Sequence, residues 1–175
     1  MLSDMGADIV RVERKGGLSL TDPKFDVLTR NRRSVFMDLR RPEGVETVLK
    51  MAEQVDALQE GFRPGVMERL GLGYETLAGK NPRLIYCSLS GYGPEGPYRA
   101  RAWHDLNYQG LAGVLDLTGP RDGRPVVPGA PVADLAGALW AAVGILLAWL
   151  ERERTGLGQR VDSSLLGGAL ACLPL

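Results

Sequence analysis

The sequence predicts an α/β fold with a mainly parallel sheet and helices on both of its faces. Segments that read as strands alternate along the chain with segments that have apolar residues at helical spacing. Hydrophobic residues make up 45% of the sequence and charged residues 24%, which is typical of a globular domain. With 175 residues the chain is long enough for one domain of ordinary size. We therefore expect residues 1–175 to form a single domain.

The first predicted elements are two strands and a helix. Residues 7–13 alternate apolar and charged side chains and predict a strand. A loop that contains Gly, Pro and Asp then runs over residues 14–30, and a short second strand is expected at 34–38. The next segment, 42–53, opens with proline and acidic residues and carries apolar residues at helical spacing. It predicts an amphipathic helix.

The remaining elements continue the alternation of strands and helices. The clearest strand in the sequence is 83–89, and the longest helix is 133–154, which ends before two glycines. Ser163 and Ser164 can cap a last helix that reaches residue 173. The other predicted elements are a strand at 55–59, short helices at 66–70 and 74–78, a helix at 105–115, a Pro/Gly-rich loop at 119–131 and a strand at 159–162.

Charge and composition exclude several classes of protein. Lys+Arg and Asp+Glu are equal at 21 each, so no overall field attracts nucleic acid or an acidic membrane. The uncharged stretch 135–150 is shorter than the roughly 20 residues that a membrane-spanning helix needs, so we expect a buried core helix and no membrane partner. Polar and acidic residues follow Met1 closely, which argues against a signal peptide and for a cytoplasmic protein. One histidine and two cysteines without ligand spacing predict no metal site and two buried, reduced thiols.

One histidine and one aspartate stand out as candidate acid/base groups. His104 is the only histidine and lies in the run Arg-Ala-Trp-His-Asp-Leu-Asn-Tyr, whereas Asp134 opens the long apolar helix. Histidine titrates near neutral pH, and a carboxylate at a helix start tends to stay ionised. The pair predicts two acid/base groups that face one pocket. The alternative for a single histidine is a structural role.

A glycine-rich segment at 91–96 matches the pattern GxGxxG after a strong strand. A dinucleotide fingerprint must open a helix, and Pro94 and Pro97 prevent a regular helix from starting there. We therefore expect an irregular loop that binds no nicotinamide dinucleotide and that a ligand or another backbone approaches closely.

Arginines gather near the ends of predicted strands. In an open α/β sheet these loops bind anionic ligands, and the guanidinium fork suits phosphate because it donates two hydrogen bonds. The alternative is a solvated surface with salt bridges. The clustered arginines are Arg11, Arg14, Arg30, Arg32, Arg33, Arg63 and Arg69.

Several blocks of the sequence resemble the family III CoA-transferases, also called the CaiB/BaiF family. They occur in the family's order and run through essentially the whole chain. The resemblance implies the Rossmann-like large domain of the CaiB/BaiF fold. The blocks are 6–13, 31–34, 62–71, 90–93, 152–156 and 158–162.

Two blocks resemble the racemase members of the family, those of the α-methylacyl-CoA racemase type. They are His104 followed by Asp105, and the segment 132–137 that contains Asp134. In racemases this implies that His104 and Asp134 exchange the α-proton of a 2-methylacyl-CoA from opposite faces, in fatty acid metabolism. In transferase members, the residue at Asp134 is instead a nucleophile that forms an acyl anhydride.

The resemblance also implies which residues bind coenzyme A, which is a part of the substrate here, so that no separate cofactor is expected. Arg14 and Arg69 have a physical reason to do so, because each can pair with phosphate. The expected contacts are Arg14, Met37, Leu39, Gly61, Arg69, Asp105 and Tyr108.

Compared with the family, the chain resembles a fragment that covers most of the large domain. The first βα unit is missing, as is the small domain with a glutamate that supports the histidine. Full-length members form interlocked dimers, which implies a homodimer. Three functions stay open: a racemase, a CoA-transferase that works through an aspartyl anhydride, and a non-catalytic CoA-binding fragment.

Overall fold

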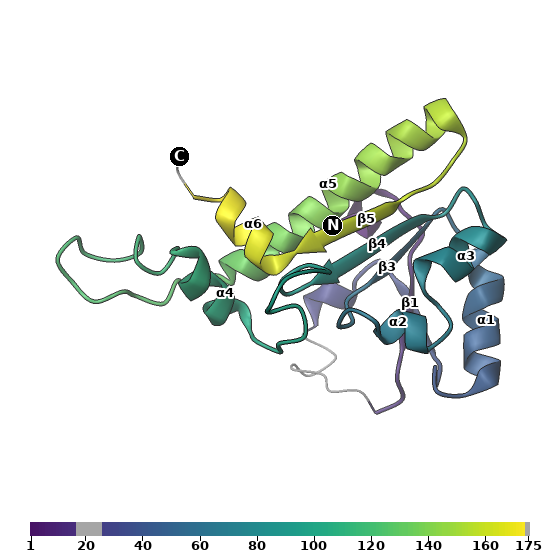
Figure 1. The fold of residues 1–175 in the computed structure, drawn as a ribbon, viewed down its shortest axis with the longest axis horizontal. Coiled ribbons are helices and arrows are strands. Elements are labelled where there is room, and N and C mark those ends of the chain that lie inside the picture. The colour runs from purple at the N-terminus through teal and green to yellow at the C-terminus, as the bar shows by residue number, and fades with distance from the viewer. Residues whose placement is uncertain (17–25, 174–175) are drawn as a thin grey trace. The chain divides into compact units, whose positions relative to one another are not determined.

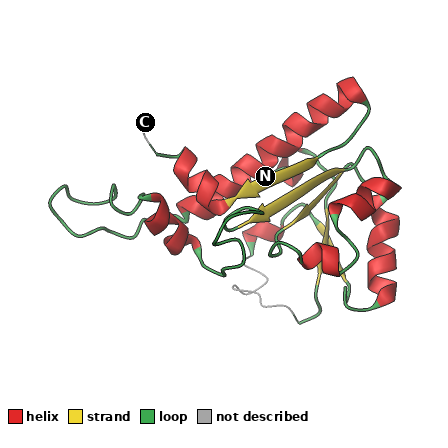
Figure 2. Ribbon diagram, in the orientation of Figure 1, coloured by secondary structure: helices red, strands yellow, loops and turns green. Residues whose placement is uncertain are grey.

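The computed structural model describes residues 1–16 and 26–173. The chain divides into two compact units, Met1–Val48 and Leu49–Leu175. Every strand pair is parallel, and helices follow the strands, so the predicted α/β class is confirmed (Figure 2). The strands form two sheets, one of two strands and one of three.

The first unit is built on a pair of parallel strands, β1 (Val10–Glu13) and β2 (Arg33–Phe36). Both strands were predicted, and both are shorter than the sequence pattern that predicted them. The predicted loop 14–30 contains a short 3-10 helix, Val27–Thr29, and residues 17–25 of this loop lie outside the described residues. Helix α1 (Pro42–Ala52) begins in this unit with a proline in its first turn, as predicted.

The second unit contains a three-stranded parallel sheet in the order β3-β4-β5 (Figure 1). Its helices lie where the sequence predicts them, and the Pro/Gly-rich segment between α4 and α5 forms turns and bends. The elements are β3 (Ala57–Glu60), α2 (Val66–Arg69), α3 (Tyr74–Lys80), β4 (Ile85–Ser90), α4 (Asp105–Ala112), α5 (Val132–Thr155), β5 (Arg160–Ser164) and α6 (Leu165–Ala171).

The central strand β4 is covered on both faces. Ile85 and Cys87 are fully buried against alanine and isoleucine side chains of α5. Tyr86 lies between them and points to the other face, because side chains alternate along a strand. There its ring meets the ring of Tyr74 from α3, edge to face, with 5.9 Å between centroids. Helices therefore cover both faces of this sheet, as the fold class predicts.

Helix α5 is buried on one side only. It packs on β4, β5, α4 and α6, but its outer side exposes large apolar side chains, so the expected buried core helix is wrong for that side. By length and composition alone, α5 is the one helix within the described residues that is apolar enough to cross a membrane, and core helices of globular proteins pass the same test. The exposed side carries Leu135, Leu139, Trp140, Val143, Leu146, Leu147, Trp149 and Leu150.

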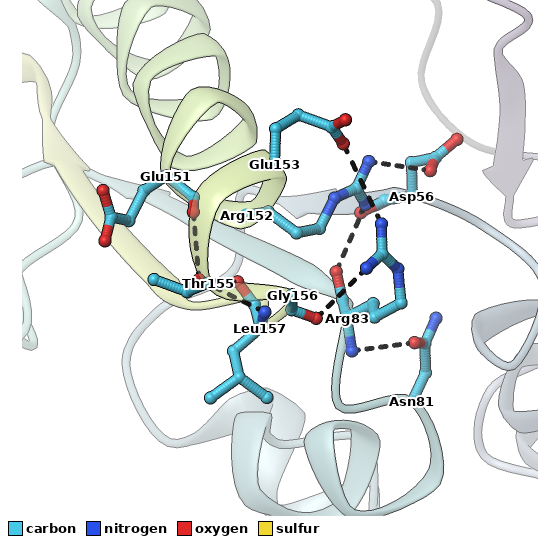
Figure 3. A network of polar contacts seen from close by, with 9 residues as sticks. All are labelled: Asp56, Asn81, Arg83, Glu151, Arg152, Glu153, Thr155, Gly156 and Leu157. Carbon is cyan, nitrogen blue, oxygen red and sulfur yellow. Dashed lines mark hydrogen bonds and ion pairs between the residues drawn. The ribbon is translucent and has the colours of Figure 1, made fainter.

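The C-terminal end of α5 is tied to the sheet by Arg152, whose side chain is 3% exposed. One terminal nitrogen donates to the Asp56 carboxylate at 3.0 Å, and the other donates to the backbone carbonyls of Asp56 and Arg83 at 3.3 and 3.2 Å (Figure 3). Asp56 and Arg83 lie just before β3 and β4, and the Trp149 ring lies 4.1 Å from the guanidinium carbon. A single buried cation therefore holds the end of the helix to the starts of two strands.

The two thiols differ in exposure. Cys87 is buried in β4, as predicted, whereas Cys172 follows α6 and is exposed. The expectation of two buried thiols is therefore wrong for Cys172. Its position explains the difference, because α6 buries Gly168 and Ala169 and ends at the surface.

Candidate active site

The predicted acid/base pair lies at the starts of two helices that pack together. His104 immediately precedes α4, where its backbone N–H donates to Asn107 Oδ1 at 3.1 Å. Asp134 lies in the first turn of α5. Both side chains are exposed, and the charge of His104 acts on the pKa of Asp134. The charges of the two groups therefore interact, and the pocket that both should face stays a prediction.

Asp105, the first residue of α4, connects the two helix starts. Its Oδ1 accepts from the backbone N–H groups of Ala133 at 2.8 Å and of Asp134 at 3.1 Å, and its Oδ2 accepts from the side-chain amide of Gln109. Gln109 is 1% exposed, and its own Oε1 has no partner among the described residues. Both carboxylate oxygens of Asp105 are thus engaged within the protein, and its contact with coenzyme A stays a prediction.

The surroundings of Asp134 raise the pKa of its carboxyl group. Partial burial is the largest cause, the negative charge of Asp105 is the second, and His104 acts in the opposite direction. A carboxyl group whose pKa is raised toward the working pH can both take and return a proton. The electrostatics therefore suit Asp134 to proton transfer.

Tyr108 supports the site from within the core. It is 3% exposed, it packs with Ala133 and Ala169, and its hydroxyl donates to the Trp103 carbonyl at 3.1 Å. A Cβ at Gly91 would lie 2.3 Å from the Tyr108 oxygen. The loop 91–96 is irregular, as predicted, and the close approach expected there comes from this tyrosine side chain. Whether Tyr108 also contacts coenzyme A stays a prediction.

Aromatic rings hold the segment that leads into α4. The Tyr92 ring lies 5.4 Å from Tyr98, 5.5 Å from Trp103 and 5.1 Å from Tyr108, measured between centroids. The Arg101 guanidinium lies 4.6 Å from the centre of the Tyr98 ring. Such offset and edge contacts stabilise beyond their buried area, so this segment presents the start of α4 on a packed support.

A cavity of about 610 Å³ lies on the face of the second sheet that carries Tyr86. Arg69 lines it, as do three further arginines, Arg63, Arg99 and Arg160. Arg160 also pairs with Asp162 at 2.9 Å. Glutamates, including those of α2 and of the end of β3, line the same cavity. Arg69, which the sequence predicts to bind phosphate, therefore has other cations beside it.

The end of β3 lies at this cavity and precedes Gly61. Glu60 Oε2 accepts from the Phe62 backbone N–H at 2.6 Å, which fixes the turn that contains Gly61. A Cβ at Gly61 would lie 3.8 Å from the Leu89 carbonyl oxygen, an ordinary contact. The predicted role of Gly61 in binding coenzyme A stays a prediction.

Three predicted coenzyme A contacts belong to the first unit. Arg14 directly follows β1 and is exposed, whereas Met37 and Leu39 follow β2 and are half-buried. The Met37 backbone N–H donates to the Glu13 carbonyl at 2.8 Å, so Arg14 and Met37 leave neighbouring strands at the same edge of the sheet. The carboxyl edge of a parallel sheet is where α/β proteins bind ligands, which is consistent with the prediction but does not test it.

Reasoning from the sequence missed how Asp105 and Gln109 act. Their spacing of four residues on a helix is a signal for an Asp–Gln pair, but the bonds from Asp105 to α5 depend on how the helices pack. It also missed Arg99 and Arg160 as residues that line the cavity with Arg69. Within residues 1–16 and 26–173, no group of three or more His, Cys, Asp or Glu side chains is placed to hold a metal ion.

Comparisons with known proteins agree on the family. The model of CoA-transferase family III matches residues 1–174. The chain is similar to α-methylacyl-CoA racemase of Homo sapiens, with 43% identity over 96% of the chain. It is also similar to succinyl-CoA:glutarate CoA-transferase of Mus musculus, with 37% identity over 98% of the chain. Relatives of both kinds therefore match at comparable identity.

A solved structure has the same fold. A CAIB/BAIF family protein from Brucella suis superposes with a TM-score of 0.90 at 36% identity, and the match covers 98% of this chain and 49% of that one. The chain spans 43% of the human racemase and 42% of the mouse transferase. It therefore corresponds to somewhat less than half of the length of these relatives.

Proposed function

The chain belongs to CoA-transferase family III. We propose that it is part of an α-methylacyl-CoA racemase, which inverts the configuration of the α-carbon of a 2-methylacyl-CoA. The observation that carries the proposal is the placement of His104 and Asp134 at two adjoining helix starts, with exposed side chains and coupled charges. Human and mouse racemases at 43% and 45% identity support it.

The reaction requires one base and one acid on opposite faces of the α-carbon. The Asp134 carboxylate takes the α-proton, and the electrons of the broken C–H bond move into the thioester to form an enolate. The His104 imidazolium then gives its proton to the opposite face, and the two residues exchange roles for the reverse direction. Backbone N–H groups at a helix start are suitable donors for the enolate oxygen.

Coenzyme A supplies the other half of the substrate. We propose that Arg69 pairs with one of its phosphates and that Arg63 contributes to the same cavity, because guanidinium groups bind phosphate through paired hydrogen bonds. Arg14, Met37, Leu39 and Gly61 remain proposed contacts. Binding of coenzyme A alone, measured by calorimetry, should weaken for Arg69→Ala and not for Arg121→Ala, which removes an exposed loop arginine.

A CoA-transferase is the second candidate function. The similarity to succinyl-CoA:glutarate and succinyl-CoA:mesaconate CoA-transferases favours it, as does the exposed carboxylate of Asp134, which is suited to nucleophilic attack on a thioester. In that reaction the Asp134 carboxylate attacks the thioester, an acyl anhydride forms and coenzyme A leaves as the thiolate. The thiolate attacks the anhydride at the Asp134 carbonyl, which releases the donor acid and leaves a thioester on Asp134. The second carboxylate displaces the thiolate to form a new anhydride, and the thiolate then attacks the new acyl carbon, which frees Asp134.

The test compares α-proton exchange with transfer of coenzyme A to a second acid. The 175-residue chain is incubated in deuterated water with enantiopure 2-methylacyl-CoA, with and without an added carboxylic acid. A racemase should exchange the α-hydrogen and lose optical purity without any acceptor. His104→Ala should lower the exchange by about 10²-fold or more, the usual contribution of a positioned acid or base, whereas Asp116→Ala is the matched control on an exposed site.

Each outcome of this test selects one function. Exchange that needs no acceptor and depends on His104 supports the racemase. Fast transfer of coenzyme A to the added acid, with no α-exchange, replaces the racemase by the transferase. Binding of coenzyme A with neither reaction leaves a non-catalytic CoA-binding chain.

We also propose that the chain associates as a homodimer. The support is the outer side of α5, which exposes a row of large apolar side chains. Extended exposed patches of this kind usually mark interfaces. Sedimentation over a wide concentration range tests the proposal, and a monomer at every concentration would contradict it.

A further inference from the structure

Helix α5 begins without a cap of its own. Pro131 occupies the N-cap position, and its side chain makes no capping hydrogen bond. The N-cap residue usually supplies a side-chain oxygen that accepts from the second or third backbone N–H of the helix. Proline has no such oxygen, so a helix of 24 residues must find its first acceptor elsewhere.

Asp105 supplies this acceptor from another helix. Counting from Pro131, the N–H groups of Ala133 and Asp134 are the second and third of α5, and both donate to Asp105 Oδ1. These are the two groups that a capping side chain normally satisfies. A negative charge is also favourable at the positive end of a helix dipole. The geometry of Asp105 is therefore that of an N-cap contributed by α4.

Pro131 has a second consequence, which concerns Asp134. A carboxylate at the third position of a helix commonly reaches back to the backbone N–H of the N-cap residue. Pro131 has no N–H, so this bond cannot form. No hydrogen bond to the Asp134 carboxylate is found within the described part of the chain, although Asp134 stands at that third position. Its carboxylate is thus released from capping.

We propose that Asp105 is a positioning residue that caps α5 in place of Pro131, fixing Asp134 while leaving the Asp134 carboxylate unengaged. As far as it concerns catalysis, the inference rests on the proposed function of Asp134. Gln109 completes the arrangement, because its buried amide holds the other oxygen of Asp105 and so orients the carboxylate.

The charges around Asp134 support this arrangement. From α4, Asp105 raises the pKa of the Asp134 carboxyl and His104 lowers it, and Asp134 in turn raises the pKa of the Tyr108 hydroxyl. Helix α6 also packs on α5, and its residues 165–171 carry no titratable side chain. The titratable neighbours of Asp134 are therefore the three residues of α4 and its start, and Asp105 is the one anion among them within the described residues.

Three variants separate the position of Asp134 from its charge environment. Asp105→Asn keeps an oxygen for the two N–H groups, and its new amide can donate to Gln109 Oε1, which lacks a partner in the native protein. Asp105→Ala removes both the bonds and the charge. Pro131→Ser gives α5 its own cap and returns an N–H that Asp134 can bind. Asp116→Asn is the matched control, because it removes one exposed carboxylate after the same helix.

The experiment is nuclear magnetic resonance of the 175-residue chain, which follows the side-chain carboxyl of Asp134 and the backbone amides of Ala133 and Asp134. Asp105→Ala should accelerate hydrogen exchange of these amides by roughly tenfold or more, the scale for a lost hydrogen bond to a charged group. Asp105→Asn should leave their exchange unchanged. The pKa of Asp134 should fall in both variants, and also in Pro131→Ser, where a hydrogen bond stabilises the carboxylate.

Unchanged amide exchange in Asp105→Ala would overturn the capping by Asp105, and an unchanged pKa of Asp134 in Pro131→Ser would overturn the release of its carboxylate from capping. If Asp105→Ala does not fold, Asp105→Asn and Pro131→Ser still decide it through the pKa of Asp134. None of these readouts requires turnover. A chain that shows the expected shifts but no α-proton exchange would therefore refute the proposed function and leave the capping role intact.

Discussion

The two ends of α5 are tied to their neighbours by opposite charges, with different results. At the C-terminal end the buried Arg152 donates to backbone carbonyls before β3 and β4, and at the N-terminal end Asp105 accepts from backbone N–H groups of α5 itself. Each charge matches the sign that the helix dipole favours at its end. The cation joins the helix to the sheet, whereas the anion joins it to another helix.

The two ends of α5 differ in whether the charged side chains around them are engaged or exposed. At the C-terminal end, Arg83 and Glu153 near Arg152 are also engaged with the protein, in a hydrogen bond to Gly156 and an ion pair (Figure 3). At the N-terminal end, the side chains of His104 and Asp134 stay exposed beside an engaged Asp105. At the C-terminal end the charged side chains are paired within the protein, although the buried Arg152 Nε has no partner among the described residues. A polar network whose charges are paired stabilises a fold, and one that leaves titratable groups exposed is suited to chemistry.

The largest expected effect is at Arg152. Arg152→Met leaves two backbone carbonyls and the Asp56 carboxylate without the hydrogen bonds that Arg152 donates. Methionine can fill the space but cannot donate these bonds. The free energy of unfolding should fall by about 3 kcal/mol, the scale for leaving two buried backbone carbonyls without a donor, whereas the Asp56 carboxylate is 63% exposed and adds little. Urea titration measures it.

The matched control is Arg154→Met, two residues further along the same turn. The Arg154 side chain is 82% exposed and pairs only with Glu151, at 3.6 Å, so its loss should change the free energy of unfolding by less than about 0.5 kcal/mol. Equal effects of the two variants would contradict the role of the buried Arg152 in holding this end of α5 to the sheet.

Two glycines, one near each end of α5, allow the two ends to be perturbed separately without changing a charge. A Cβ at Gly158 would lie 2.1 Å from the Leu84 carbonyl oxygen, and one at Gly168 would lie 2.5 Å from the Gly137 backbone nitrogen in α5. Either Gly→Ala change should destabilise the fold by about 1–3 kcal/mol, as overpacking does. Only Gly168→Ala should also shift the resonances of Asp134, because α6 then presses on the first turns of α5.

Gly79→Ala is the control for both glycines. Gly79 lies within α3 and has open space around it, so alanine there should stabilise the helix by about 0.5–1 kcal/mol. Identical resonance shifts at Asp134 in the Gly158 and Gly168 variants would contradict the separation of the two ends.

The sequence predicted most of the fold because its elements carry local signals. Residues 83–89 are apolar enough to mark a strand with both faces covered, and the glycines after Thr155 mark the end of α5. The exposed side of α5 was not predicted, because an apolar sequence indicates a need for burial and says nothing about what covers it. Arg152 lies in the charged run Glu-Arg-Glu-Arg and is indistinguishable there from its exposed neighbours.

The candidate site was predicted in its residue types and not in its supports. His104 and Asp134 were recognisable because an isolated histidine and a carboxylate at a helix start are unusual in an apolar setting. The bonds from Asp105 to Ala133 and Asp134 join residues that are distant in sequence, and they exist only once α4 and α5 pack together. A pattern with local range cannot contain them.

The two thiols provide a probe of the middle of α5, between its ends. Burial, with smaller contributions from Glu60 and Asp162, raises the pKa of the Cys87 thiol to about 11, and this thiol lies under α5. Cys172 is exposed. At pH 8 a disulfide reagent should react rapidly with one thiol, and Cys172→Ser should remove this phase. Arg152→Met should accelerate the slow reaction of Cys87, because it loosens the helix that covers this thiol. Equal reaction rates for the two thiols of the native chain would show that α5 does not shield Cys87.

The smallest expected effect concerns Asp134 and its dependence on pH. Because its folded pKa is raised, the folded chain holds this proton more tightly than the unfolded chain. That contribution to stability is complete below the ordinary aspartate pKa of about 3.9 and is lost as pH rises through the raised value. Asp134→Asn cannot lose a proton, so its stability relative to the native chain should increase over this window.

Unfolding by urea at a series of pH values measures the difference. Asp116→Asn, on an exposed turn, is the matched control. If the stability of Asp134→Asn relative to the native chain stays flat with pH, the N-terminal end of α5 does not disfavour the ionised carboxylate, and the contrast with the C-terminal end, where the charge of Arg152 is paired, would disappear.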